Sequence, residues 1–411
     1  MTDTTVTMAD ILTSLIRLSE KAAHLARTIR SEHALFELLV EEKTGTAKNK
    51  RFQQDFKTLA DVLIQEMVKH NLGKQFPSII GHIHGEEDNT FTNQLGETIT
   101  VEVQPSLQQT SDLLCTVLDG NQHAAMLLAE AVHWEVTMET DQRLTAAAND
   151  IPVESLGIWI DPIDSTAEYI RGAEDETATD GVFHRGLQCC TVLIGAFDRQ
   201  SGLPVMGVVN QPFAYKDQET LRWRSRHLWG VCYNGYHCHS LMDADSTVTM
   251  TTEQPNQSEA DRVAVTTEQS HQSESGRVPS VVLSESESDD IKSLLSKAGY
   301  RLCYANGAGY KMLCVIDNLV DAYVLTKSST YKWDTCGPHA ILRALGGGMV
   351  DLEATVKLFK PETGEVDLKQ LQIKYNQPDS GTTTWGNMGG LLAYRSPGHA
   401  LNVPKALCSL H

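Results

Sequence analysis

The spacing of apolar and polar residues predicts helices in the first third of the chain. Over residues 8–30, apolar side chains recur every three or four positions, from Ile11 through Leu18 to Ile29, as on one face of an amphipathic helix. The same reasoning predicts helices over residues 35–42 and 58–70, with a polar loop at 43–51. Residues 110–147, in which acids and alanines are interleaved, are also expected to be helical.

Short apolar runs predict strands from the middle of the chain onward. Such runs occupy residues 157–160, 187–197, 204–209 and 229–233, with a turn at Gly202. The last third predicts strands over 281–283, 320–325, 349–352 and 390–394, and helices over 290–299 and 335–345. Because helices alternate with strands that are partly consecutive, we expect an α/β fold of stacked layers with mixed sheets.

Residues 243–280 interrupt this pattern. They are rich in Ser, Thr, Glu and Gln, and the stretch that begins at Thr251 recurs in altered form from Thr266. Such a composition buries too little apolar area to offset the entropy of an ordered chain, so we expect a mobile insertion. The sequence therefore predicts an N-terminal α/β lobe over 1–242 with metal-binding motifs, and a C-terminal α/β lobe over 281–411 that completes the metal and substrate site.

The charge of the chain limits its partners. The 411 residues carry a formal net charge of −19, which argues against a nucleic-acid partner, since such partners need a basic surface. An anionic small substrate would also be repelled unless bound cations invert the local charge. No apolar run approaches the ~18 residues of a membrane span, so no membrane insertion is expected. The nine cysteines form no C-x-x-C pair, which favours free thiols in a reducing, cytoplasmic compartment.

Four acidic segments begin or end predicted elements. Each has a simple structural explanation by itself: an acid on a helix face, an exposed turn, or the N-cap of a helix. The segments are Asp55-x-x-Thr58-x-x-Asp61, Glu86-Glu87-Asp88, Asp161-Pro-Ile-Asp164-Ser-Thr166 and Trp333-Asp334.

The segment from Asp161 to Thr166 is the most informative of the four. A strand delivers Asp161, and a turn at Pro162 is expected to return the Ile163 carbonyl and Asp164 to the same point. The hydroxyls and backbone N–H groups of Ser165 and Thr166 follow at once. Hard oxygen ligands for Mg²⁺ would thus lie beside donors for a phosphate. Two metal ions that share carboxylates suit the hydrolysis of a phosphate monoester.

In this order, the four segments resemble the inositol monophosphatase superfamily of lithium-sensitive phosphatases. The family pattern has an acid after T-x-x, then G-E-E, D-P-[IL]-D-[GS]-T and W-D, and the match covers most of the chain outside the insertion. Ser165 stands where many members have Gly, and this feature, with the stretches 307–311 and 389–395, resembles the branch that acts on inositol polyphosphates. The resemblance implies the layered α-β-α-β-α sandwich of the inositol monophosphatase and fructose-bisphosphatase type.

The resemblance also implies a role for individual residues. Two to three Mg²⁺ ions would be held, the first by Glu86, Asp161 and the Ile163 carbonyl, and the second by Asp161, Asp164 and Asp334, with Li⁺ as an inhibitor. Asp61 and Thr166 would activate the attacking water, with Glu87 nearby. The residues implied in substrate binding are Asp164, Ser165, Thr166, Ser286, Gly307, Ala308 and Lys311.

One position departs from the family pattern. The polyphosphate branch has a lysine that helps to hold the distal phosphate, whereas this chain has Ser288 there. The loss puts the preference for a bisphosphate in question and leaves the metal chemistry intact.

The resemblance predicts a cytoplasmic, monomeric phosphatase for small soluble inositol phosphates. Its expected reaction is removal of the 1-phosphate from inositol 1,4-bisphosphate and from inositol 1,3,4-trisphosphate. Two alternatives stay open: a 3′(2′),5′-bisphosphate nucleotidase, and a catalytically inactive metal-binding scaffold whose insertion docks a partner. Every acid of the pattern is present, which favours an enzyme.

Overall fold

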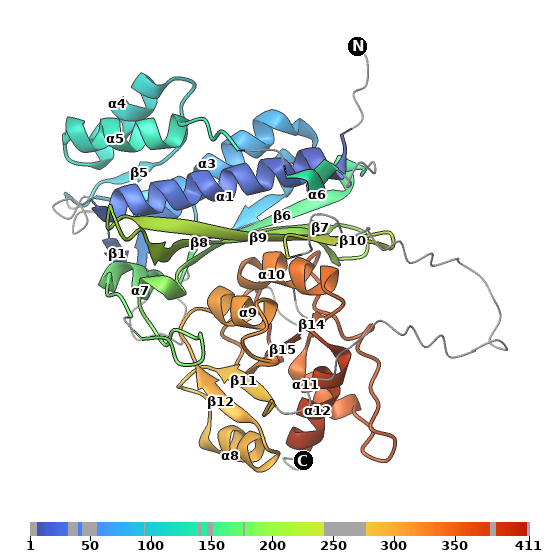
Figure 1. Ribbon diagram of the computed structural model, residues 1–411. Coiled ribbons are helices and arrows are strands. Elements are labelled where there is room, and N and C mark those ends of the chain that lie inside the picture. The colour runs from blue at the N-terminus through green and yellow to red at the C-terminus, as the bar shows by residue number, and fades with distance from the viewer. Residues whose placement is uncertain are drawn as a thin grey trace.

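The structure is a computed structural model that describes residues 6–31, 40–42, 56–93, 95–138, 141–145, 151–175, 177–241, 277–378 and 384–408. Within these ranges, two large sheets are stacked with layers of helices (Figure 1). The helices that pack against the first sheet include α1 (Met8–Ser31), α3 (Leu59–Gln75), α9 (Ala308–Ile316) and α10 (Lys332–Ala344).

The first sheet comes from the middle of the chain. Its strands are β3 (Ile83–Gly85), β6 (Leu156–Asp164), β7 (Thr191–Asp198), β8 (Pro204–Lys216), β9 (Trp223–Tyr233) and β10 (Tyr236–His239). They lie in the order β10-β9-β8-β7-β6-β3, and all neighbours are antiparallel except β3 and β6, which are parallel. Helices α1 and α3 cover one face of this sheet, and α9 and α10 lie against the other (Figure 1).

The second sheet comes from the last third of the chain. Its strands are β11 (Ser280–Leu283), β12 (Arg301–Tyr304), β13 (Ala322–Leu325), β14 (Gly348–Val350) and β15 (Leu391–Tyr394), in the order β12-β11-β13-β15-β14. Strand β11 is parallel to β12 and β13, whereas β15 is antiparallel to β13 and β14. Its outer face is covered by α8 (Asp289–Lys297), α11 (Leu352–Leu358) and α12 (Pro397–Leu407).

The layers therefore follow the order helix, sheet, helix, sheet, helix, and the predicted α-β-α-β-α sandwich with mixed sheets is confirmed (Figure 1). The division into lobes 1–242 and 281–411 stays a prediction.

Smaller elements complete the described chain: β1 (Val40–Glu42), β2 (Phe56–Thr58), β4 (Thr90–Thr92), β5 (Thr98–Thr100), α4 (Leu107–Val117), α5 (Gln122–His133), α6 (Gln142–Thr145), α7 (Thr166–Arg171), and the 3₁₀ turns Pro77–His82, Val153–Ser155 and Leu187–Cys189.

Three clusters of buried apolar side chains hold the layers together. The first lies between the first sheet and the helices α1 and α3, and includes Leu15, Leu63 and Ile160. The second fills the layer of α9 and α10 between the sheets, and the third lies under α8, α11 and α12. Burial of this apolar surface is the dominant stabilising contribution, as expected for stacked layers.

Glycines let helix α10 approach the first sheet closely. A Cβ atom at Gly207 would lie 2.2 Å from the Gly337 carbonyl oxygen, and one at Gly195 would lie 2.4 Å from the Gly337 nitrogen. Any side chain at these strand positions would push the helix away. The close packing fixes the start of α10 beside the end of β6, where the acids of the candidate site lie.

Several predicted boundaries are wrong. Residues 40–42, expected to be helical, form strand β1, since pairing with β2 overrides the local helical spacing; residues 32–39 lie outside the described residues, as do 43–51. The helix expected over 110–147 is broken, because residues 134–138 are not helical. The strand expected over 187–197 begins only at Thr191, and Leu352 starts a helix. Of the predicted insertion, residues 243–276 lie outside the described residues.

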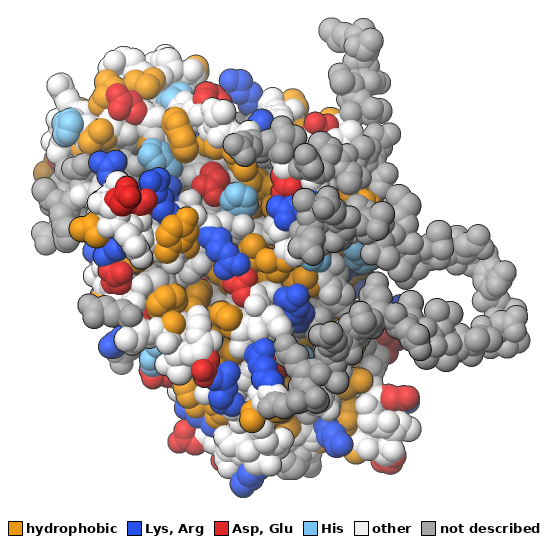
Figure 2. Space-filling view, in the orientation of Figure 1, with side chains coloured by type: hydrophobic (Ala, Val, Ile, Leu, Met, Phe, Trp, Pro, Cys, Tyr) orange, Lys and Arg blue, Asp and Glu red, His pale blue; other side chains and the backbone are white. Residues whose placement is uncertain are grey.

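The surface seen in Figure 2 carries acidic and basic side chains interspersed with apolar ones. Among the described residues drawn in colour on this face, lysines and arginines do not gather into one basic surface. Within the described part of the chain, no helix is both long enough and apolar enough to span a membrane.

Candidate metal and phosphate site

Strand β6 presents Asp161 to the layer between the two sheets. Ile158 and Ile160 belong to the core under α1 and α3, whereas Trp159 belongs to the core around α9 and α10. Because side chains alternate along a strand, Asp161 lies on the same face as Trp159. The sequence therefore delivers a carboxylate, rather than another apolar group, to the start of α10.

A β-bulge brings Asp164 to the same place. Asp161 pairs with Leu193 on β7 and Asp164 with Thr191, so the stretch from 161 to 164 has one residue more than the strand opposite. Such a bulge redirects the side chains that follow it. The turn expected at Pro162 is thus a bulge within β6, which continues to Asp164.

Helix α10 supplies the third acid, Asp334. One carboxylate oxygen each from Asp161, Asp164 and Asp334 lies within 4.8 Å of the others, and the three side chains are 1%, 8% and 9% exposed. The structure thus brings together three of the predicted metal ligands from positions far apart in the sequence.

The cluster is electrostatically unfavourable by itself. Burial first, and then the charges of Glu86, Asp164 and Asp334, raises the pKa of Asp161 well above its ordinary value. Burial and the neighbouring acids likewise raise the pKa of Asp334 well above its usual range. For Asp164, burial raises the pKa, while Lys311 acts in the opposite direction. The charge of Glu86 also raises the pKa of each of the three acids, although its carboxylate does not belong to the group of oxygens that lie within 4.8 Å of one another.

The donor set fits a divalent cation. Among the described residues, Asp161 Oδ1 is buried and has no hydrogen-bond partner. An unpartnered buried carboxylate oxygen is costly, and a hard cation with oxygen ligands would both neutralise and coordinate it. A metal ligand therefore explains the buried Asp161 carboxylate better than a purely structural acid does.

Asp61 and Asp334 also stabilise their own helices. Asp61 Oδ2 accepts hydrogen bonds from the backbone N–H and the hydroxyl of Thr58, each at 2.7 Å, at the start of α3. Asp334 accepts the backbone N–H of Tyr331 in the same way at the start of α10. These are N-terminal capping interactions, which fix each carboxylate relative to its helix. Capping a helix, as expected from the sequence, therefore does not exclude a catalytic or metal-binding role for Asp61 and Asp334.

The charge of Asp61 acts on two buried groups at α7. The pKa of the buried Cys190 thiol is raised by burial first and also by the charges of Asp164 and Asp61. Burial, followed by Asp61, likewise raises the pKa of Tyr169 on α7. Tyr169 belongs to α7, and Cys190 Sγ lies 3.8 Å from the carbonyl oxygen of Ser165, the N-cap of this helix.

Gln65 was missed by the sequence reasoning. This buried side chain accepts the backbone N–H of Glu87 at 2.9 Å and donates to the Glu87 carbonyl oxygen. The Glu86 N–H in turn donates to the Ile160 carbonyl at 3.2 Å. The turn that carries Glu86 and Glu87 is thus fixed to both α3 and β6. The position of Gln65 four residues after Asp61, on the same helix face, was the available signal.

Ser165 adopts a left-handed backbone conformation, with φ 74° and ψ 44°. A residue other than glycine is uncommon there, which explains structurally why glycine is acceptable at this position in related patterns. The Thr166 hydroxyl donates to the Ile163 carbonyl oxygen at 3.1 Å. Helix α7 starts at Thr166, with Ser165 as its N-cap.

Asp164 connects the bulge to helix α9. Its carboxylate accepts the backbone N–H groups of Gly309 at 2.7 Å and Ala308 at 3.3 Å. Gly307, with φ 76°, begins this helix, and a Cβ atom there would lie 2.6 Å from the Cys189 carbonyl oxygen. The backbone at Gly307 and Ala308 is therefore held against Asp164, one of the predicted metal ligands.

The remaining predicted substrate contacts lie in different environments. Lys311 is only 4% exposed; its ammonium donates to the Ala305 carbonyl at 3.2 Å and lies 5.2 Å from the centre of the Tyr323 ring. Ser286 is exposed, and its carbonyl oxygen accepts Lys327 Nζ. Ser288 is the N-cap of α8 and accepts the Ile291 N–H.

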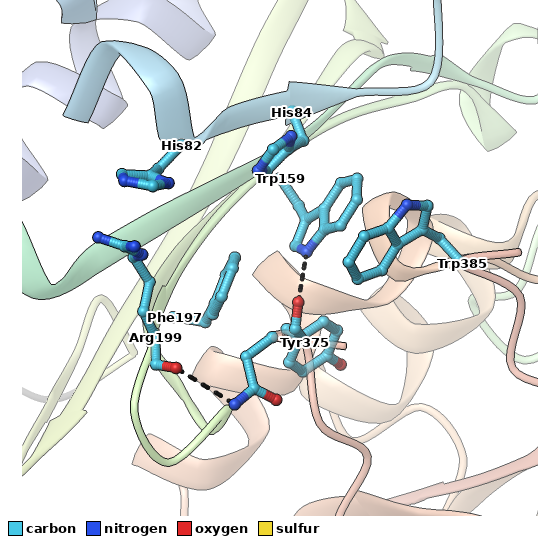
Figure 3. Close-up of a pocket in the computed structure, with 8 residues that line it drawn as sticks. His82, His84, Trp159, Phe197, Arg199, Tyr375 and Trp385 are labelled. Carbon is cyan, nitrogen blue, oxygen red and sulfur yellow. Dashed lines mark hydrogen bonds between the residues drawn. The ribbon is translucent and has the colours of Figure 1, made fainter. Parts of the chain in front are cut away.

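An aromatic pocket is lined by side chains of β3, β6 and the C-terminal part of the chain (Figure 3). It has a volume of about 260 Å³, and Trp159, His84 and Trp385 are neighbours along its wall. The Trp159 indole N–H donates to the Tyr375 carbonyl at 3.1 Å. Since Trp159 precedes Asp161 by two residues and His84 precedes Glu86 by two, this packing supports the two strands that carry the acids.

Comparison with known proteins identifies the class of this fold and site. The sequence profile described as the inositol monophosphatase family matches residues 83–393. The chain therefore belongs to the inositol monophosphatase family.

Individual relatives show which branch of the family this chain resembles. The inositol polyphosphate 1-phosphatase of Mus musculus is 48% identical over 391 residues, which cover 95% of this chain and 94% of the relative. The 3′(2′),5′-bisphosphate nucleotidase 1 of Homo sapiens is 25% identical and covers 87% of each chain. A solved structure, the IMPase of Thermotoga maritima, is similar with a TM-score of 0.45 and 14% identity over 97% of each chain. The resemblance to the polyphosphate branch is thus confirmed.

Proposed function

We propose that this protein is a Mg²⁺-dependent, Li⁺-inhibited phosphatase that removes the 1-phosphate from inositol 1,4-bisphosphate and from inositol 1,3,4-trisphosphate. The observation that supports it most is the buried cluster of Asp161, Asp164 and Asp334 directly before the Ser165 turn. The 48% identity to an inositol polyphosphate 1-phosphatase over 95% of the chain supports the choice of substrate.

Glu86, Asp161 and the Ile163 carbonyl would hold one ion, and Asp161, Asp164 and Asp334 a second, with a third near Glu86. When bound, such ions neutralise the phosphate and stabilise the charge that develops on its oxygens. The raised pKa values of Asp161 and Asp334 support this assignment, because a bound cation would offset the burial and mutual repulsion that disfavour their ionised forms.

The chain itself orients the attacking water in this proposal. Thr166 donates its hydroxyl proton to the Ile163 carbonyl, so its oxygen keeps lone pairs for a proton of the water. Asp61, fixed by Thr58, would accept the proton that the water loses, and the turn at Glu87 would limit where the water can lie. Ser165 and Thr166 would hold the scissile phosphate, and Gly307, Ala308, Lys311 and Ser286 the rest of the substrate.

We also infer that the protein is cytoplasmic and monomeric. All nine cysteines are free thiols, six of them buried, which fits a reducing compartment. The substrates would be small soluble inositol phosphates.

Product analysis tests the proposed reaction. Purified protein with Mg²⁺ and inositol 1,4-bisphosphate is expected to yield inositol 4-phosphate and inorganic phosphate. Phosphorus NMR measures both products. A chelator and millimolar-scale Li⁺ are each expected to suppress the signal of free phosphate. Release of the 4-phosphate, or turnover that persists in the chelator, would contradict the proposal.

A further inference from the structure

A second cavity, of about 550 Å³, opens at the C-terminal end of α7, the helix that follows Ser165. It lies between the end of α7, residues 173–174 and 184–185, the loop before α8, and Asn306. Its volume falls within the range of small-molecule sites. The polar residues that line it are Arg171, Glu174, His184, Arg185, Glu285 and Asn306.

A chain of hydrogen bonds joins this cavity to the candidate site. The Glu168 N–H donates to the Ser165 carbonyl at 2.9 Å, and the buried Glu168 carboxylate accepts Asn306 Nδ2 at 2.9 Å. Asn306 directly precedes Gly307, where a Cβ atom would lie 3.1 Å from Asp164 Oδ2. The cavity wall and the predicted metal ligands are therefore adjacent parts of one rigid structure.

The acids around this cavity already have basic partners. Glu285 lies 3.1 Å from His184, Glu174 pairs with Lys216, and Glu168 pairs with Arg171. Arg185, by contrast, is exposed, and its guanidinium makes no ion pair with any residue that the structure describes. The side chain of Arg171 is 57% exposed, and a guanidinium has five donors, of which the contact with Glu168 uses few. The cavity thus offers free cationic donors in a chain of net charge −19.

The loop that carries Arg185 is held in place. Asp175 Oδ2 accepts the backbone N–H groups of His184 at 3.0 Å and Arg185 at 3.3 Å. Gln188, which is buried, bonds both the N–H and the carbonyl of Asp175. A backbone fixed in this way reduces the conformational entropy that Arg185 loses on binding an anion.

We propose that this cavity binds a phosphate of the substrate that is not cleaved, with Arg185 as its principal cation and Arg171 as its second. The inference rests on the proposed function. Arginine forks bind phosphate oxygens in pairs, which suits both side chains. Along α7, Arg171 lies about 7.5 Å beyond Thr166, and the 1- and 4-phosphates of inositol 1,4-bisphosphate project from opposite corners of the ring.

Two nearby side chains do not offer an exposed positive charge to the second phosphate. Ser288 is neutral and caps α8. The Lys311 ammonium is buried against the Ala305 carbonyl and the Tyr323 ring. The nearby ammonium groups of Lys292 and Lys327 donate to the carbonyl oxygens of Glu285 and Ser286, whereas Arg185 and Arg171 line the cavity itself.

The test compares Arg185→Gln with Arg199→Gln, a matched change of another exposed arginine outside this cavity. Initial rates are measured with Mg²⁺ on inositol 1,4-bisphosphate and on inositol 1-phosphate. For Arg185→Gln we expect kcat/KM on the bisphosphate to fall about tenfold or more, mainly through KM, as for loss of a charge-assisted contact. On the monophosphate we expect less than a ~2-fold change, as with Arg199→Gln on both substrates.

Two further measurements distinguish a binding role of Arg185 from a structural one. Arg185→Lys is expected to restore part of the loss, and inhibition by inorganic phosphate is expected to be unchanged in Arg185→Gln. An equal loss on both substrates, or an equal loss for Arg199→Gln, would overturn the subsite. If the wild-type protein does not prefer the bisphosphate at all, the proposed function fails instead.

Discussion

The side chain of Gln65 binds both backbone polar groups of Glu87: its amide oxygen accepts the N–H at 2.9 Å, and its amide nitrogen donates to the carbonyl. Gln65 lies one helical turn after Asp61 on α3. One face of this helix therefore positions the proposed water-activating acid and the turn with the proposed metal ligand Glu86. The distance between these groups depends on α3 as a rigid element.

Gln65→Leu tests this coupling. The change removes both hydrogen bonds between the Gln65 side chain and the Glu87 backbone, at a cost of about 1–3 kcal/mol in the free energy of unfolding. We also expect the Mg²⁺ concentration for half-maximal activity to rise by about 10-fold or more, as for the loss of residues that orient ligands. Urea unfolding and a Mg²⁺ titration measure the two effects. Gln108→Leu, at an exposed position of α4, is the control; an unchanged Mg²⁺ requirement for Gln65→Leu would contradict the coupling.

Asp161→Asn should act in opposite directions on stability and activity. Without metal, removal of one buried charge relieves repulsion within the cluster, so we expect a higher melting temperature than for the wild-type protein. With Mg²⁺ the wild-type protein should gain stability, while the variant should gain little. Activity is expected to fall on the order of 100-fold or more. Thermal melts with and without Mg²⁺ are decisive, and a lower melting temperature of the metal-free variant would argue against repulsion.

The same cluster predicts how the stability of the metal-free protein depends on pH. The folded-state pKa values of Asp161 and Asp334 are raised above the unfolded value of about 4. Between these values the folded state binds more protons than the unfolded state, so stability falls as pH rises. Urea unfolding between about pH 5 and pH 7.5 should show this decline, and Asp334→Asn should reduce its slope. Stability that rises with pH over this window in the metal-free protein would contradict the raised pKa values.

Two substitutions of Ser165 distinguish the effect of its backbone conformation from the effect of its hydroxyl. Ser165→Gly relieves the left-handed backbone, by roughly 1 kcal/mol, but costs about 0.4–1 kcal/mol through the freer unfolded chain, so its stability should change little. Ser165→Ala keeps the unfavourable conformation and also lacks the hydroxyl. If the hydroxyl binds phosphate, both variants should lose about 5- to 10-fold in kcat/KM. A loss in Ser165→Ala alone would assign the effect to the backbone.

Much of this organisation could be predicted from local sequence. The apolar spacing of α1 and the acids at Asp161, Asp164 and Asp334 are local features, and they indicated the fold class and the metal cluster. Strand β1 could not be predicted, because pairing with β2 decides its conformation rather than its own apolar content.

Long-range contacts account for the rest. Asp164 accepts the N–H groups at the start of α9, more than 140 residues later, and no local pattern shows this. The contact of Gln65 with Glu87 likewise depends on the packing of α3 against the strands. The same is true of the cavity around Arg185, which only the fold assembles from three segments.

The most direct test of the account is a comparison of initial rates of phosphate release by the purified protein with Mg²⁺. The substrates are inositol 1,4-bisphosphate, inositol 1-phosphate and adenosine 3′,5′-bisphosphate, with Asp161→Asn as the control. We predict the highest kcat/KM on inositol 1,4-bisphosphate, and a rate lower by on the order of 100-fold or more for Asp161→Asn. A higher kcat/KM on adenosine 3′,5′-bisphosphate would identify a nucleotidase instead, and equal rates for Asp161→Asn would contradict the metal cluster as the site of catalysis.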